Sequence, residues 1–194
     1  MDRVRYFFAL LTVVSVPAAV LWWVIIHPTI EFWRRLGPGL TYIIMTVMSF
    51  ASMAVLFALR GPILSVEFGT NHALIAIGAL LYAASLYVEI RARKYLKFRT
   101  LVGLPELSPE RPGPGLLTEG IYSRVRHPRY VAVTLGMFAF ALFTNYLAMY
   151  VLAVLVIPTL YWVVLLEEKE LRDRFGSEYV SYSERVPMFF PKMI

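Results

Sequence analysis

The chain has 194 residues, of which 59% are hydrophobic and only 16% charged, and its mean hydropathy is +0.64. Soluble domains carry about 25% charged residues, so this composition excludes an ordinary soluble globule as well as a disordered chain. The chain has no cysteine, and its three histidines lie 45 and 55 residues apart, so we expect no disulfide, no thiol nucleophile and no bound metal.

Long uncharged stretches predict the membrane spans, since about 20 apolar residues form a helix that crosses a bilayer. Residues 6–26, 40–59 and 68–88 meet this criterion, and the third helix is expected to begin near Asn71. The first stretch is too long for a cleaved signal peptide and lacks a small-residue cleavage site after it. We therefore expect it to remain as a span.

The next uncharged stretch, residues 130–166, is too long for one span. Its 37 residues would form a helix of about 55 Å, nearly twice the roughly 30 Å of a hydrocarbon core. Thr144 and Asn145 near its centre favour a turn, which predicts a tight hairpin of helices over residues 130–143 and 147–166. The chain is thus expected to be an all-α integral membrane protein with five transmembrane helices, forming a single domain over residues 1–194.

The distribution of lysine and arginine favours five spans. With five, sixteen of these residues lie on the side of the long loop (residues 89–129) and the tail (residues 167–194), and three lie on the other side. Cytoplasmic loops carry the excess of Lys and Arg, so we expect the N-terminus outside and the C-terminus in the cytoplasm. The net charge of +6 then reflects orientation in the membrane. Because the basic residues are scattered, nucleic acid is not an expected partner.

The sequence GIYSRVRHPRY, at residues 120–130, leads into the first helix of the hairpin. Pro128 is typical of the first turn of a helix, which places His127 at the N-cap. The backbone N–H groups and the positive dipole end of such a helix can bind an anion or a carboxylate. A plain helix start with interfacial cations explains the same residues, so this segment alone leaves both interpretations open.

Acidic residues follow the last predicted span, most of them spaced for i,i+4 pairing and therefore expected to be solvated. The pairs are Glu168 with Arg172, Lys169 with Asp173, and Glu170 with Arg174. Glu167 has apolar residues at both i±4 positions, and its carboxylate is costly there unless a cation or a hydrogen-bond donor meets it. It either reaches water or contacts a ligand. Gly176 is expected to stop the helix, before a short helix over residues 177–184 and an apolar segment, residues 186–191, that packs back on the membrane face.

These two segments together resemble the isoprenylcysteine carboxyl methyltransferase family, within the wider group of membrane methyltransferases that includes phospholipid N-methyltransferases. The matching pieces are GIYSRVRHPRY and, after the hairpin, EEKELRDRFGSEYVSYSERVP. RHPxY alone is a weak signal, but its order and distance from the tail make the combination specific. The resemblance is strong over about the last 80 residues, and the first three spans match only as generic membrane helices.

The resemblance implies a multi-pass enzyme that uses S-adenosylmethionine to methylate the carboxylate of a prenylated substrate entering from the bilayer. The catalytic part would be residues 89–194, with the cofactor site formed by the cytoplasmic loop and tail. The cofactor-binding positions it implies are Pro114, Gly115, Leu116, Leu117, Tyr122, His127, Pro128, Arg129, Tyr130 and Glu167. Arg126 and Tyr130 are expected to position the reactants.

The chain departs from the family at one position. Eukaryotic relatives place an arginine four residues before the matching glutamate to meet the prenylcysteine carboxylate, and that position here is Val163. Arg126 and Arg174 are the candidate substitutes.

The chemistry of the acceptor separates the remaining alternatives. A carboxylate, with a pKa near 3.5, needs no general base, so we expect binding residues and no acid–base pair. A phospholipid amine must first lose a proton, which Glu167 or His127 would accept. A sterol-reductase-like enzyme using NADPH shares similar C-terminal motifs. A carrier or channel is disfavoured, because the spans contain no charged residue and the sequence shows no repeat.

Overall fold

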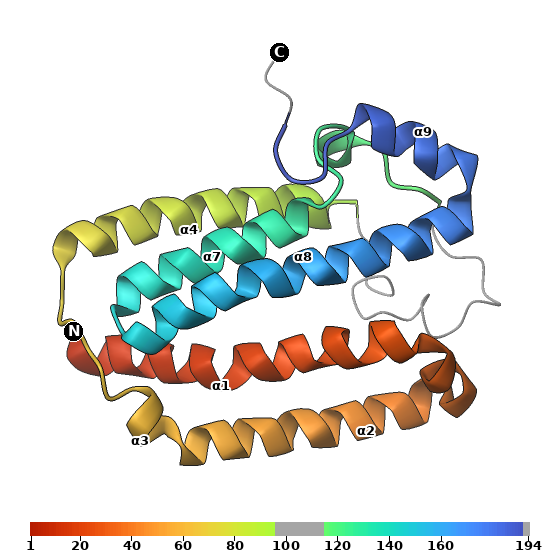
Figure 1. The fold of residues 1–194 in the computed structure, drawn as a ribbon. Helices are drawn as coiled ribbons and strands as arrows, with labels where there is room; N and C mark the ends of the chain where they lie inside the picture. The colour runs from red at the N-terminus through yellow and green to blue at the C-terminus, as the bar shows by residue number, and fades with distance from the viewer. Residues whose placement is uncertain (96–114, 192–194) are drawn as a thin grey trace.

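The computed structural model describes residues 1–95 and 115–191, which fold into a helical bundle (Figure 1). The helices are α1 (Asp2–Ile26), η1 (His27–Thr29), α2 (Ile30–Ala58), α3 (Arg60–Ile63), α4 (His72–Arg93), η2 (Gly120–Ser123), α7 (Pro128–Thr144), α8 (Leu147–Phe175) and α9 (Ser177–Arg185). Among these described helices, α1, α2, α4 and α8 are long and apolar enough to cross a membrane. The all-helical class is confirmed for the described residues, and α7, an apolar helix of 17 residues, stays a predicted fifth span.

The predicted hairpin is formed by α7 and α8, which lie side by side (Figure 1). Asn145 ends α7 in the left-handed conformation, with φ 57°, and its N–H donates to the carbonyl of Ala141 at 2.9 Å. Asparagine is one of the few residues other than glycine that adopts this conformation readily. The turn therefore lies where the sequence predicts it. Helix α8 continues beyond residue 166, and Gly176, with φ 54°, follows its last residue as predicted.

Two other helix starts show which local signals are reliable. Helix α4 begins as predicted, because the side chain of Asn71 accepts hydrogen bonds from the N–H groups of Ala73 and Leu74 at 3.0 and 3.2 Å. Helix α2 begins ten residues before the predicted span. Its regular geometry is interrupted at Gly37, with φ 76°, so the predicted span at residues 40–59 corresponds to the part of α2 after the kink.

Helix α4 packs against α7 through small residues. A side chain at Gly78 would place its Cβ 2.9 Å from the carbonyl oxygen of Ala139, and one at Gly136 would lie 3.2 Å from the hydroxyl of Ser85. That hydroxyl donates to the carbonyl of Ala132 at 2.8 Å. Small residues let membrane helices approach closely, and here they bring the end of α4 beside the start of α7.

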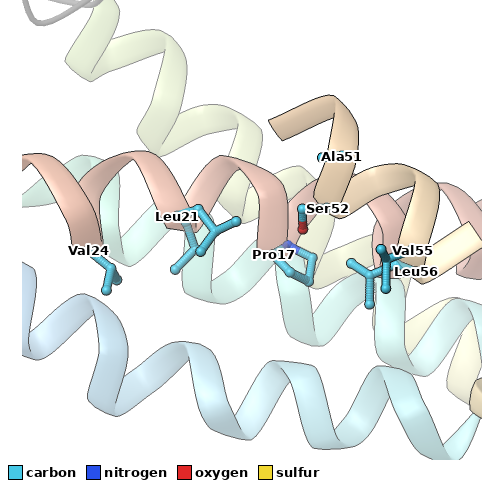
Figure 2. Close-up of a pocket in the computed structure, with 8 residues that line it drawn as sticks. Pro17, Leu21, Val24, Ala51, Ser52, Val55 and Leu56 are labelled. Carbon is cyan, nitrogen blue, oxygen red and sulfur yellow. The ribbon is translucent and has the colours of Figure 1, made fainter. Parts of the chain in front are cut away.

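An apolar groove of about 550 Å³ lies between α1 and α2 (Figure 2). Pro17 and Leu21 of α1 and Val55 and Leu56 of α2 lie along it, and Ser52 is the polar residue among those that line it. A polar, charged cofactor requires polar partners, so this groove does not suit S-adenosylmethionine.

Arg5 fixes α1 to the turn of the hairpin at the end of the bundle opposite α9 (Figure 1). Its side chain is fully buried, and its guanidinium donates to the carbonyl of Thr144 at 2.9 Å and to the hydroxyl of Thr70 at 2.9 Å. It also forms ion pairs with Glu67 at 2.8 Å and with Asp2 at 3.1 Å. These contacts join three segments that are far apart in the sequence.

Replacing Arg5 by alanine is therefore expected to lower the free energy of unfolding by about 2–3 kcal/mol, because the substitution removes the cation paired with Glu67 and the donor to the Thr144 carbonyl. Thermal unfolding of the detergent-purified protein measures the effect. Arg3→Ala is the matched control, since Arg3 lies two residues away and is exposed. Unfolding of the Arg5→Ala protein at the wild-type temperature would contradict this role.

Candidate active site

The two motif segments meet at one end of the hairpin, where α7 begins and α8 continues past it (Figure 1). His127 occupies the N-cap of α7, and Pro128 lies in its first turn, as the sequence predicts. Both residues are buried. The motif residues of α7 therefore face the acidic residues of α8 across the interior of the protein.

The carboxylate of Glu167 is met by a hydrogen-bond donor and by the ring of a histidine. One oxygen of its carboxylate accepts a hydrogen bond from the hydroxyl of Tyr130, and the other lies 3.7 Å from Nδ1 of His127. The Glu167 side chain remains 26% exposed, whereas Tyr130 and His127 are buried. The structure thus brings together three of the predicted site residues, and solvent or a ligand can still reach the carboxylate of Glu167.

Glu168 is buried, so the prediction that it forms a solvent-exposed pair with Arg172 is wrong about its exposure. The contact with Arg172 exists at 3.6 Å, but closer partners come from another segment. The guanidinium of Arg126 meets Oε1 of Glu168 through Nε at 2.8 Å and through Nη2 at 2.6 Å. Nε2 of His127 lies 3.2 Å from the same oxygen. His127 therefore lies between the carboxylates of two adjacent glutamates.

Arg126 also holds the C-terminal segment against the start of α7. Its Nη1 donates to the carbonyls of Ser183 and Val186 at 2.7 and 2.5 Å. The backbone N–H groups of Arg126 and His127 donate to the carbonyls of Pro187 and Met188 at 2.9 and 3.1 Å. The segment after α9 thus packs back on the bundle, and the guanidinium of Arg126 is occupied by Glu168 and two carbonyls.

Buried tyrosines close the side of the site next to α9. The hydroxyl of Tyr182 donates to the carbonyl of Tyr122 at 2.7 Å, and burial raises the pKa of both phenols to about 12. Arg129 lowers the pKa of Tyr122, while Glu89 and Glu167 raise it. Both phenols therefore stay protonated at neutral pH, so Tyr182 remains a hydrogen-bond donor.

The predicted loop ahead of η2 is described from Gly115 onward. Leu116 packs against the apolar cluster of Tyr179, Tyr182 and Val186. Leu117 follows it in the chain, and Pro114 lies outside the described residues. This part of the predicted cofactor loop thus lies beside α9.

Gly120 permits the close approach of η2 to the end of α4. Its φ is +60°, a conformation that residues with side chains rarely adopt, and a Cβ there would overlap the ring of Tyr95. The approach places Tyr122 near Glu89, a residue that the sequence analysis missed. Glu89 accepts a hydrogen bond from Nε of Arg93 at 2.6 Å and lies 3.9 Å from Nε of Arg129.

Val163, which occupies the position where the resemblance predicts a substrate-binding arginine, lies in the apolar core. Val163 is fully buried in the apolar cluster that also contains Tyr130 and Leu160. Of the two candidate substitutes, Arg126 is engaged as described above, and Arg174 lies over the ring of Phe175 at 4.8 Å. Within residues 1–95 and 115–191, no group of three or more His, Asp or Glu could hold a metal ion.

A family model described as phospholipid methyltransferase matches residues 73–178, more than half of the chain. The chain belongs to this family. The matched region begins in α4, ends in α9 and contains the hairpin and the site residues from Glu89 to Glu168, whereas Tyr182 and the segment after α9 lie beyond it. The protein is therefore a member of a membrane methyltransferase family, in agreement with its long apolar helices.

Two curated relatives of this protein have names that refer to metal resistance. The nickel-cobalt-cadmium resistance protein NccN of Alcaligenes xylosoxydans xylosoxydans is 32% identical over 78 residues, covering 40% of this chain and 37% of NccN. The cobalt-zinc-cadmium resistance protein CzcN of Cupriavidus metallidurans is 33% identical over 78 residues, covering 40% of this chain and 36% of CzcN. The similarity thus spans little more than a third of these relatives. No solved structure matches the chain.

Proposed function

We propose that this protein transfers a methyl group from S-adenosylmethionine to the carboxylate of an isoprenylcysteine-like lipophilic substrate at the cytoplasmic face of the membrane. The observation that carries the proposal is the meeting of Tyr130, His127 and Glu167, which joins the HPxY element of α7 to the acidic end of α8. The family supplies the methyltransferase class, and the sequence resemblance supplies the acceptor.

The charges of the site fit S-adenosylmethionine, which carries two cationic groups and one carboxylate. Glu167 offers a partly exposed carboxylate to a cation. The first turn of α7 offers backbone N–H groups and a positive dipole end to an anion. We propose that these groups hold the cofactor together with residues 114–117, Tyr122 and the HPRY element, to which Arg129 contributes its backbone N–H.

The residues of the chain would position the reactants and exclude water. When bound, S-adenosylmethionine supplies an electrophilic methyl group on a positively charged sulfur, which an ionised carboxylate can accept without a general base. Tyr130 is held by Glu167 and packs in the apolar core, so it would orient groups beside α7. Arg126 would act from a distance, by holding the segment after α9 in place.

A phospholipid headgroup is the second candidate acceptor, favoured by the description of the family model. Its amine must lose a proton before it can attack a methyl group. Glu167 is the candidate base because its carboxylate is partly exposed, and the adjacent ring of His127 is the other candidate. Membership of a methyltransferase family disfavours the NADPH-dependent reductase.

The proposed orientation places the site in the cytoplasm and α7 across the membrane. At 1.5 Å per residue, the 17 residues of α7 extend about 26 Å, slightly less than a hydrocarbon core. The bias of Lys and Arg toward the side of α9 supports this orientation.

Calorimetric titration of the detergent-purified protein tests the proposal, with S-adenosylhomocysteine and NADPH as separate ligands. We expect binding of S-adenosylhomocysteine alone. Binding of NADPH alone would contradict the proposal and favour the reductase, and binding of neither ligand would also contradict it.

A further inference from the structure

Arg129 is an accessible and incompletely paired cation of the described site. Its side chain is 34% exposed, while its Nε is buried and has no hydrogen-bond acceptor in the described part of the chain. The carboxylate of Glu89 lies 3.9 Å from this nitrogen, too far for a good hydrogen bond. A buried N–H without an acceptor is costly, so Arg129 retains capacity for an anion.

The surroundings of Arg129 place it beside the proposed cofactor site. Arg129, Glu89 and Glu167 all act electrostatically on the phenol of Tyr122, and Arg129 directly precedes Tyr130, which donates to Glu167. Glu89 is already tied to Arg93 at 2.6 Å. Its charge can therefore hold the guanidinium of Arg129 in place, while the Nε–H of Arg129 remains without a hydrogen-bond acceptor.

The other candidates for an anion-binding cation are worse placed. Arg126 is occupied by Glu168 and by two carbonyls, and Arg174 lies over the ring of Phe175. Val163, where an arginine is expected from the resemblance, lies in the apolar core. Arg129 belongs to α7, whereas Val163 belongs to α8, and it lies at the end of the hairpin where the site is found.

We propose that the guanidinium of Arg129 binds the anionic group of the lipophilic acceptor, a carboxylate or a phosphate, and that Glu89 positions it. The inference rests on the proposed function and assigns the side chain of Arg129 to the acceptor, leaving its backbone N–H to the cofactor. Carboxylates and phosphates both present oxygens that an arginine binds in a bidentate manner, which a lysine cannot reproduce. The chemistry at Arg129 is the same for both acceptors.

Kinetics of four proteins test this assignment: wild type, Arg129→Ala, Arg129→Lys and Arg124→Ala. Arg124 is exposed and lies just ahead of α7, so its replacement controls for the loss of one positive charge at this end of the protein. The acceptors are farnesylcysteine with an acetylated amine, which offers a carboxylate, and phosphatidylethanolamine, which offers a phosphate. Titration with S-adenosylhomocysteine measures cofactor binding separately.

We expect Arg129→Ala to raise the KM for the acceptor roughly ten- to hundred-fold, with less effect on kcat and an unchanged Kd for S-adenosylhomocysteine. Arg129→Lys should recover part of the loss, and Arg124→Ala should behave like wild type. A raised KM for farnesylcysteine identifies the carboxylate as the bound group, and a raised KM for phosphatidylethanolamine identifies the phosphate.

Three results would overturn the inference. The first is an unchanged KM in Arg129→Ala, and the second is a loss of S-adenosylhomocysteine affinity as large as the rise in KM. The third is a wild-type protein that binds S-adenosylhomocysteine but methylates neither acceptor. A wild-type protein that does not bind S-adenosylhomocysteine would instead overturn the proposed function, and the inference with it.

Discussion

Glu168→Ala is expected to lower the free energy of unfolding by about 3–5 kcal/mol and to weaken binding of S-adenosylhomocysteine severely. The substitution would leave the guanidinium of Arg126 buried without its carboxylate, and His127 would lose one of its two acidic neighbours. Because Arg126 also holds the carbonyls of Ser183 and Val186, the segment after α9 would loosen as well. Thermal unfolding in detergent and calorimetric titration measure the two effects.

Asp173→Ala is the matched control, since Asp173 is an exposed carboxylate on the same helix. Its replacement should change the unfolding temperature little. Arg126→Ala should cost about as much stability as Glu168→Ala, and the double variant should cost less than the sum of the two, as expected for residues that act as a pair. Glu168→Ala and Asp173→Ala proteins of equal stability would show that the buried pair does not hold this end of the molecule.

Local signals were enough to predict the hairpin and the start of α4. An uncharged stretch too long for one span and an asparagine near its centre define the turn at Asn145, because one residue in the left-handed conformation ends a helix. Asn71 caps α4 through contacts two and three residues away. Both features depend on neighbours in the sequence, so no knowledge of the fold is needed.

The environment of Glu168 could not be predicted in the same way. Helical spacing identifies partners three or four residues away, and it correctly suggested Arg172. The dominant partner, Arg126, lies 42 residues earlier in the sequence and is brought close by the hairpin. The contact between Glu89 and Arg129 depends likewise on the packing of α4 against α7.

The early start of α2 has a different cause. The predicted span at residues 40–59 rests on an uncharged stretch bounded by Arg35 and Arg60, and Gly37 and Pro38, which precede it, are typical of a turn. In the structure a helical segment precedes Gly37, whose φ of 76° accommodates the change of direction. The glycine and proline mark a kink in this case, and residues 30–36 extend the helix on its far side.

Glu167→Ala is expected to weaken binding of S-adenosylhomocysteine at least about ten-fold while leaving the unfolding temperature close to that of wild type. The Glu167 side chain is 26% exposed and contacts Tyr130 and His127, so its loss uncovers less buried charge than the loss of Glu168. The replacements of the two adjacent glutamates should therefore have different effects: Glu167→Ala weakens binding, and Glu168→Ala lowers both binding and stability. Titration and thermal unfolding of the same preparations measure the difference.

Tyr130→Phe tests whether Glu167 must be oriented or only present. The phenylalanine keeps the aromatic ring in the apolar core and removes the hydroxyl that donates to Glu167. We expect an affinity between those of wild type and Glu167→Ala, because the carboxylate remains but loses the donor that fixes its direction. Wild-type affinity in both variants would mean that Glu167 is an interfacial carboxylate reaching water. The cofactor would then have to be held by the first turn of α7 and the loop ahead of η2.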